Sequence, residues 1–305
     1  MINGEGTIHD LRPGPRALLY IAHASKEFFG KHVEIINHSA YPKDYPELSA
    51  TFLQNCDREK EKAVEERAQA VYKAAYANLD FVAIRESFSL NEMEKNGIKA
   101  LLSFDCLPLY IRDHYHHTKQ IEQKTVVLAG SVAFTEPGAL QLCLFLEGME
   151  KTGFKIKVLI GAKAFPARDD KRFVEFLTSH CKADWELVDA TSLEEWLDTI
   201  NNATLLVSGR FHHSIAAFCL NTPFIAFNSN THKVHAFCQM IGEPQPLLYS
   251  DPNLLEQLNV RMQAILSSPA PDHTEKMQFL CDLAERNFDG LRALVTRGRL
   301  IAPML

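Results

Sequence analysis

Short apolar runs alternate with longer amphipathic segments along the chain. The runs have the length of β-strands, and most carry hydrophobic residues on both faces, as strands buried in a parallel sheet do. The segments between them place apolar residues three or four positions apart, which indicates helices. This alternation predicts an α/β protein with parallel sheets. We expect strands at 32–37, 80–84, 98–102, 125–128, 155–160 and 185–188, and helices at 13–29, 58–79, 87–95, 138–152, 169–180, 192–200, 254–266 and 275–296.

The alternation occurs in two halves, and a chain of 305 residues is long enough for two domains with separate cores. The polar, histidine-rich segment at about 111–124 lies between the halves, and we interpret it as a linker. The sequence therefore predicts an N-terminal domain over residues 1–115 and a C-terminal domain over 125–275. Apart from Asp113, no cysteine or carboxylate stands at metal-ligand spacing beside His114, His116 and His117, so we expect no metal site there.

The segment from Ala203 to Val234 carries the most informative pattern. Its apolar run Ala203–Val207 predicts a buried strand, and Ser214–Leu220 predicts a small-residue helix that ends at the Asn-Thr-Pro sequence 221–223. Phe224–Phe227 predicts the next strand. The polar break between the first strand and the helix lies at the carboxyl end of a parallel strand, where open α/β sheets bind their ligands.

The polar break reads Ser208-Gly209-Arg210-Phe211-His212-His213. A helix that begins here offers unpaired backbone N–H groups and a positive dipole end to an anion. Arg210 can grip a carboxylate or phosphate with two hydrogen bonds, and His212 can carry a proton beside it. Ser208 and Gly209 are suited to shaping the turn and exposing backbone amides. For His213 we consider a packing role and a direct contact with the ligand equally.

Composition narrows the class of protein. A net charge of −6 without a basic stripe argues against a nucleic-acid binder. The seven cysteines form no paired motif, which is typical of reduced thiols in a cytoplasmic protein. No apolar run approaches the roughly 18 residues of a membrane-spanning helix, so any lipid-linked substrate would be met by peripheral membrane contact.

The sequence SGRFHHSIAAFCLNTPFIAF, followed by Lys233, resembles the signature of the polysaccharide pyruvyl transferase family. Three further segments resemble family motifs in the same order along the chain: Asn3–His9, Arg85–Ser89 and Gly97–Pro108. The resemblance implies two Rossmann-like domains in a GT-B-like arrangement around a central cleft, with a C-terminal helix (276–305) that bridges back to the N-terminal domain. It also implies a transferase that moves pyruvate from phosphoenolpyruvate, a co-substrate and not a bound cofactor, to a sugar of a cell-surface glycan or its precursor, forming a ketal.

The resemblance assigns the donor to the C-terminal domain and the acceptor, a glycan or lipid-linked glycan, to the N-terminal domain. Catalytic roles fall to His212, Arg210 and Glu5. The expected donor-binding residues are Ser208, Gly209, Arg210, His213, Ser214, Lys233, Gly130 and Ser131, and the expected acceptor-binding residues are Glu5, His9, Arg85 and Asp105.

Several of these residues have a second interpretation. Lys233 contacts the ligand or is a solvated residue at the start of a helix. Glu5, in a Gly-x-Gly turn, binds an acceptor hydroxyl or acts as the general base, and His9 is an equal candidate. Arg85 faces the cleft or pairs with Glu86, and Asp105 binds the acceptor or forms a turn before Pro108.

Two departures from the family pattern keep other functions open. Family members often carry an arginine just after the first strand of the C-terminal domain, whereas this chain has Gly130-Ser131 there, whose amides suit a different activated donor. Almost no strand precedes the Gly4-Glu5-Gly6 loop, so that strand is a stub or the true start lies upstream. The alternatives are a GT-B glycosyltransferase that uses a nucleotide-activated sugar, and an inactive carbohydrate-binding relative.

Overall fold

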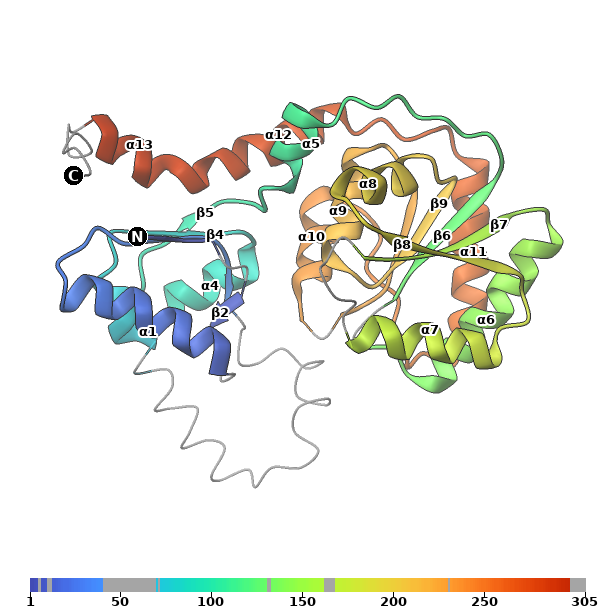
Figure 1. The fold of residues 1–305 in the computed structure, drawn as a ribbon, viewed down its shortest axis with the longest axis horizontal. Helices are drawn as coiled ribbons and strands as arrows, with labels where there is room; N and C mark the ends of the chain where they lie inside the picture. The colour runs from blue at the N-terminus through green and yellow to red at the C-terminus, as the bar shows by residue number, and fades with distance from the viewer. Residues whose placement is uncertain are drawn as a thin grey trace, which may run out of the picture. The chain divides into compact units, whose positions relative to one another are not determined.

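A computed structural model describes residues 1–4, 7–9, 13–40, 70, 72–130, 133–161, 168–229 and 231–296. The chain divides into two compact units, and Figure 1 shows the elements of each. Unit 1 comprises residues 1–109 and 278–305, and unit 2 comprises residues 110–277. The loop after residue 40 lies outside the described residues. So does most of the helix expected at 58–79, of which residues 70 and 72–77 are described and helical.

Unit 1 is built on a parallel sheet. Its described strands are β1 (Ile2–Asn3), β2 (Thr7–His9), β3 (Glu34–Ala40), β4 (Phe81–Ile84) and β5 (Leu101–Leu102), in the order β1-β3-β4-β5, with β2 also pairing with β3. Every pairing is parallel. The helices of this unit include α1 (Pro13–Glu27) and α4 (Ser87–Lys95), and β1 is a two-residue strand before the Gly4 loop.

The last part of the chain packs on unit 1 through one buried asparagine. Asn287 lies in the 3₁₀ turn η1 (Arg286–Phe288), between α12 (Thr274–Glu285) and α13 (Asp289–Thr296). Its Oδ1 accepts hydrogen bonds from the backbone N–H of Asn37 at 2.7 Å and from the Ser103 hydroxyl at 3.0 Å. Its Nδ2 donates to the Phe104 carbonyl at 2.7 Å. The Asn287 side chain thus links η1 to β3 and to the segment after β5. The helix expected at 275–296 is interrupted at this turn.

Unit 2 contains a parallel sheet with Rossmann strand order. The strands are β6 (Thr125–Ala129), β7 (Lys155–Gly161), β8 (Trp185–Ala190), β9 (Leu205–Ser208) and β10 (Phe224–Ala226), arranged β10-β9-β6-β7-β8. If the five strands of this unit are numbered 1 to 5 along the chain, the order from β8 to β10 is 3-2-1-4-5. This is the doubly wound pattern of dinucleotide-binding folds. The predictions of an α/β fold and of parallel sheets are therefore confirmed.

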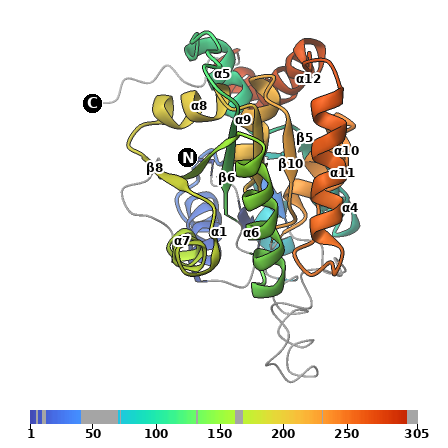
Figure 2. The same cartoon turned by 90° about the vertical axis from the view of Figure 1, so that its right-hand side faces the viewer.

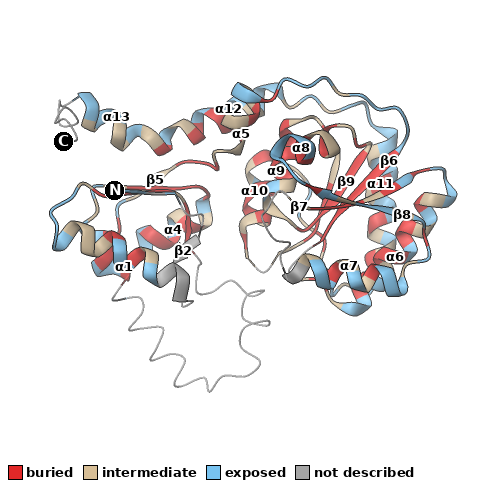
Figure 3. Ribbon diagram, viewed as in Figure 1, coloured by how far each residue is buried: buried red, intermediate tan, exposed pale blue. Residues whose placement is uncertain are grey.

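Helices cover both faces of the unit 2 sheet (Figures 1 and 2). On one face α6 (Glu136–Lys151), α7 (Arg168–His180) and α11 (Leu254–Ser267) bury a core that includes Val126 and Leu128 of β6. On the other face lie α8 (Leu193–Asn201), α9 (Phe211–Cys219) and α10 (Lys233–Ile241). Val126, Val127 and Leu128 are all fully buried, which explains the unbroken apolar run, and Figure 3 shows the same burial along the other central strands.

Two element boundaries differ from the sequence prediction where function is concerned. Helix α9 begins at Phe211 and not at Ser214, so both histidines of the polar break belong to its first turn. The segment expected as a linker begins inside α5 (Leu107–His114) and continues along unit 2, where Tyr115 and His117 contact Asp198.

No helix in the described ranges is long and apolar enough to cross a membrane.

Candidate anion-binding site at the switch point of unit 2

The strand order creates one topological switch point in the unit 2 sheet, between β6 and β9. From β6 the chain moves outward through β7 and β8, and from β9 it moves the other way to β10. Ala129 and Ser208 are register partners at the carboxyl ends of the two central strands. Gly130 and the turn Ser208–Arg210 therefore leave the sheet side by side, in the crevice where doubly wound sheets bind ligands.

Hydrogen bonds hold the Arg210 turn in one conformation. The buried Ser208 accepts a hydrogen bond at its Oγ from the Arg210 backbone N–H, at 3.0 Å. Arg210 is the N-cap of α9 in an extended conformation, with φ −102° and ψ 127°. The Ser214 hydroxyl donates to the Arg210 carbonyl at 3.3 Å, and the Ser208 carbonyl accepts from the Phe227 N–H at 2.8 Å. Ser208 and Ser214 thus shape the turn, and the turn directs the Arg210 side chain from the N-terminus of α9.

Asp170 holds the Arg210 guanidinium, and sequence reasoning did not single it out. The Asp170 carboxylate forms a hydrogen-bonded ion pair with Arg210 Nη2. The two side chains are 13% and 20% exposed, so the pair is largely desolvated. Asp170 lies in the first turn of α7, three residues before Phe173 and hence on the same side of the helix. The positive group of the site is therefore balanced by a carboxylate in the ligand-free protein.

Gly130 lets α7 approach the end of β6. A Cβ atom at this position would lie 3.0 Å from the ring of Phe173, which is fully buried. A larger residue at position 130 would push α7, and Asp170 with it, away from the strand end. The expected partner in the turn, Ser131, lies outside the described residues.

The other donor-site predictions separate into different environments. His212 is exposed on the first turn of α9, with its ring edge-to-face with Phe211. The Nε2 of His213 accepts a hydrogen bond from the indole N–H of the buried Trp196 at 2.9 Å, so this ring is tied to α8. Lys233 is the first residue of α10 and is half-buried. Gly209 is buried within the turn.

Two of the residues predicted to bind the acceptor bind each other. Arg85 Nη1 donates to Asp105 at 2.8 Å, and Arg85 Nε donates to the Ser39 hydroxyl at 2.7 Å. Only 3% and 4% of the two charged side chains is exposed. Asp105 also accepts from the Leu107 N–H at 3.0 Å, so it does form the turn into α5. The pair joins the carboxyl ends of β4 and β5.

Glu5 and His9 are the remaining acceptor-site predictions. Glu5 lies outside the described residues, and of His9 only the backbone is described, in β2 opposite Ala40 of β3. Helix α1 begins at Pro13, where the sequence predicts the first helix.

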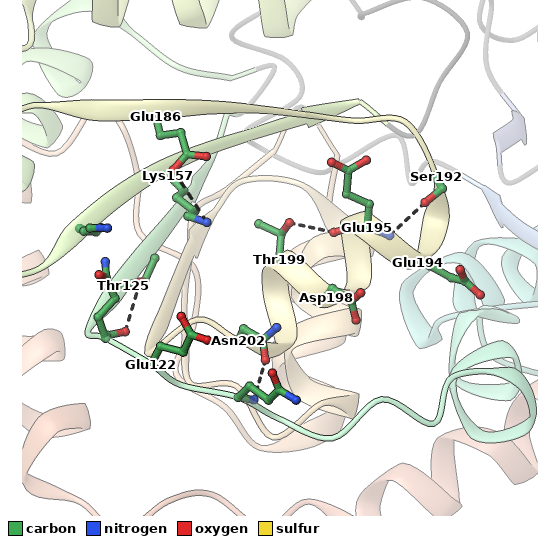
Figure 4. A pocket seen from close by; sticks show the side chains of 13 residues that line it. Glu122, Thr125, Lys157, Glu186, Ser192, Glu194, Glu195, Asp198, Thr199 and Asn202 are labelled. Atoms are coloured by element: carbon green, nitrogen blue, oxygen red, sulfur yellow. Dashed lines mark hydrogen bonds and ion pairs between the residues drawn. The ribbon is translucent and has the colours of Figure 1, made fainter.

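A separate groove of about 630 Å³ opens along α8 and the beginning of the unit 2 strands (Figure 4). Thr125 and Lys155 mark the amino ends of β6 and β7, so this groove lies at the opposite edge of the sheet from Arg210. Carboxylates outnumber its two lysines, which disfavours an anionic ligand. Its lining consists of Gln120, Glu122, Gln123, Thr125, Lys155, Lys157, Glu186, Ser192, Glu194, Glu195, Asp198, Thr199 and Asn202.

The histidine-rich segment shows no metal-binding arrangement. His117 Nδ1 lies 2.7 Å from Asp198, which also accepts from the Tyr115 hydroxyl at 2.6 Å. In the part of the chain that the structure describes, no three His, Cys, Asp or Glu side chains gather closely enough to hold a metal ion.

Solved structures with similar folds define the class of this protein. A UDP-GlcNAc 2-epimerase from Methanocaldococcus jannaschii aligns with a TM-score of 0.53 over 95% of this chain and 84% of its own, at 12% identity. A UDP-GlcNAc 2-epimerase from Neisseria meningitidis, bound to UDP-GlcNAc, aligns with a TM-score of 0.56 over 91% and 73%, at 11% identity. An α,α-trehalose 6-phosphate synthase from Burkholderia multivorans aligns with a TM-score of 0.51 over 94% and 71%, at 10% identity. The chain therefore has the GT-B type of α/β fold.

The family follows from the sequence itself. Residues 48–231, more than half of the chain, match the profile of the polysaccharide pyruvyl transferase family. The chain belongs to this family, and it is a transferase. Among curated protein sequences, none matches it significantly. The match includes the Arg210 turn, α7 with Asp170, and the carboxyl end of β6.

Proposed function

We propose that this protein transfers the pyruvyl group of phosphoenolpyruvate to a sugar of a cell-surface glycan or its precursor, and that unit 2 binds the donor. The observation that carries the proposal is the position of Arg210. It lies at the switch point of a Rossmann-type sheet, at the N-terminus of α9, with its turn fixed by Ser208 and Ser214. An arginine and a helix N-terminus together favour a small, highly charged anion such as phosphoenolpyruvate.

The chemistry needs an acid near the methylene carbon of the donor. Protonation of this carbon turns the methylene into a methyl group and leaves the adjacent carbon electron-deficient. A sugar hydroxyl then bonds to that carbon and releases its proton, and the carbon–oxygen bond to phosphate breaks. A second hydroxyl adds in the same way to close the ketal, so one proton remains in the methyl group and one leaves with phosphate.

His212 is the candidate acid for the first step. Its side chain is exposed on the first turn of α9, two residues from Arg210. From this position it can hand a proton to the methylene carbon of a donor that is bound at the Arg210 turn.

The second candidate is a glycosyltransferase reaction with a nucleotide-activated sugar. Two observations favour it: Gly130 stands where family members often carry an arginine, and the similar Neisseria meningitidis epimerase was solved with UDP-GlcNAc bound. In this version Arg210 would bind a phosphate of the nucleotide. In either version we assign acceptor recognition, a glycan or lipid-linked glycan, to unit 1.

The experiment that separates the two reactions is a donor assay in heavy water. The protein is incubated with a mixture of simple glycosides and either phosphoenolpyruvate or UDP-GlcNAc, while phosphate and UDP release are followed. We expect phosphate release from phosphoenolpyruvate that depends on the glycoside, with deuterium in the methyl group of the product. Arg210→Ala should abolish this release. UDP release without phosphate release from phosphoenolpyruvate would establish the glycosyltransferase instead.

A further inference from the structure

Tyr249 lies beside the Arg210 turn, in a segment that the sequence pattern did not single out. Its ring stacks on that of Phe227, with 4.2 Å between the ring centroids and 21° between the planes. Phe227 in turn donates its N–H to the Ser208 carbonyl at 2.8 Å. The Tyr249 ring is therefore connected to the turn that positions Arg210 through one stacked aromatic residue.

The backbone of Tyr249 is fixed independently of its side chain. The Thr135 hydroxyl, at the N-cap of α6, donates to the Tyr249 carbonyl at 3.0 Å. The same carbonyl passes so close to α6 that a Cβ atom on Gly138 would lie 2.0 Å from it. With backbone and ring both held, the hydroxyl has little freedom to turn elsewhere.

The Tyr249 hydroxyl is buried and has no hydrogen-bond partner among the described residues. Only 1% of this residue is exposed. Two other buried tyrosines are satisfied: the Tyr76 hydroxyl lies 2.6 Å from His38 Nε2, and the Tyr115 hydroxyl donates to Asp198 at 2.6 Å. A buried hydroxyl without a partner is costly and rare in folded proteins, which points to a partner that arrives with a ligand.

The charge of Arg210 reaches this hydroxyl. Burial raises the pKa of Tyr249 well above its ordinary value, and the positive charge of Arg210 opposes that rise. The residue therefore stays protonated at neutral pH and can donate its O–H. A neutral O–H donor and a guanidinium each favour a negative oxygen, so the two groups together complement an oxyanion.

We propose that the Tyr249 hydroxyl donates a hydrogen bond to a phosphate or carboxylate oxygen of the anion that Arg210 binds, which makes Tyr249 a donor-binding residue. The inference rests on the proposed function of the switch-point site. It gives the buried hydroxyl a partner and gives the anion a second hydrogen-bond donor beside Arg210.

Tyr249→Phe tests the proposal because it removes only the hydroxyl and keeps the stacked ring. Affinity for phosphoenolpyruvate, measured by titration calorimetry, should fall about tenfold or more, as for loss of a hydrogen bond to a charged group. The melting temperature without ligand should stay the same or rise, because no internal hydrogen bond is lost. Tyr76→Phe is the matched control: it removes a buried hydroxyl that has a partner in unit 1. It should lower the melting temperature and leave donor affinity unchanged.

Two results would overturn the assignment: unchanged affinity in Tyr249→Phe, or a fall in the ligand-free melting temperature like that of Tyr76→Phe, which would reveal an internal partner. Titration with UDP in parallel separates this proposal from the proposed function. If the wild-type protein binds UDP and not phosphoenolpyruvate, the pyruvyl donor is wrong, and the effect of Tyr249→Phe on UDP affinity decides the role of the hydroxyl. If the wild-type protein binds neither, both proposals fail.

Discussion

Replacing Asp170 by asparagine should make the protein less stable and its anion site tighter at the same time. Asp170 forms the ion pair with Arg210 in the ligand-free protein. An incoming phosphate or carboxylate needs the same guanidinium, so donor binding must weaken or break this pair. Asparagine keeps the size of the side chain and part of its hydrogen bonding but removes the competing charge.

The burial of the pair sets the magnitude. With side chains 13% and 20% exposed, it lies between the exposed pairs worth about 0–1 kcal/mol and the fully buried pairs whose disruption costs about 3–5 kcal/mol. We therefore expect the ligand-free Asp170→Asn protein to lose about 1–2 kcal/mol of unfolding free energy. The wild-type protein loses this attraction when the donor binds, whereas the variant has no such attraction to lose. The donor affinity of the variant should therefore exceed that of the wild type by the same free energy, which corresponds to about 5- to 30-fold.

Denaturant unfolding without ligand and calorimetric titration with phosphoenolpyruvate measure the two effects separately. Asp198→Asn is the control, because Asp198 is also hydrogen-bonded in unit 2 but lines the opposite edge of the sheet. It should lower stability without changing donor affinity. If Asp170→Asn is less stable but binds the donor with wild-type affinity, the anion does not compete for Arg210. Weaker binding would mean that Asp170 orients Arg210 for the donor, and either result refutes the reasoning.

Three further outcomes follow from the geometry. His212→Gln should lower turnover by about 10²- to 10⁴-fold with little change in donor affinity, whereas near-normal turnover in steady-state assays would exclude His212 as the acid. Gly138→Ala should lower the free energy of unfolding by about 1–3 kcal/mol or more, because its Cβ would collide with the Tyr249 carbonyl. Gly148→Ala, in the same helix with open space around it, should raise the free energy of unfolding. Equal effects of the two substitutions in denaturant unfolding would contradict the close approach. Burial raises the pKa of Glu243, and the charge of Lys276 opposes that rise. The protonated carboxyl therefore contributes to the unfolding free energy below the ordinary pKa of 4.5, and this contribution is lost as pH rises through the raised pKa. Glu243→Gln should be more stable than wild type at neutral pH and lose that advantage in acid. A pH-independent difference in unfolding free energy would contradict this last point.

Much of the fold could be predicted because strands buried on both faces are apolar throughout. The boundaries of β6, α4 and α8 lie within a residue or two of the prediction, and the Ser192 side chain caps α8 by accepting from the Glu195 N–H at 3.1 Å. The start of α9 was wrong by one turn. Only its buried part, from Ser214 onward, shows an apolar pattern, and the polar residues His212 and His213 in the first turn mask the start of the helix.

The missed residues of the site are those whose role depends on a distant segment. Asp170 is one of several charged residues at the start of α7, and nothing local distinguishes it from a solvated carboxylate. Its partner Arg210 is reached only because α7 crosses the end of β6 over Gly130. Tyr249 follows two leucines, so its ring looks like an ordinary core residue, and only the structure reveals its unpaired hydroxyl. The Arg85–Asp105 ion pair could have been predicted from the sequence, because both residues follow neighbouring parallel strands.

The claim that Arg210 binds phosphoenolpyruvate at the switch point is tested most directly by calorimetric titration of the wild-type protein and of Arg210→Lys. The lysine keeps the charge but loses the planar fork of the guanidinium. We expect measurable binding of phosphoenolpyruvate by the wild-type protein, weakened about 10- to 100-fold in the variant, as for a charged hydrogen bond worth about 1.5–3 kcal/mol. Equal affinity of the two correctly folded proteins for phosphoenolpyruvate, or binding of UDP-GlcNAc alone, would contradict it.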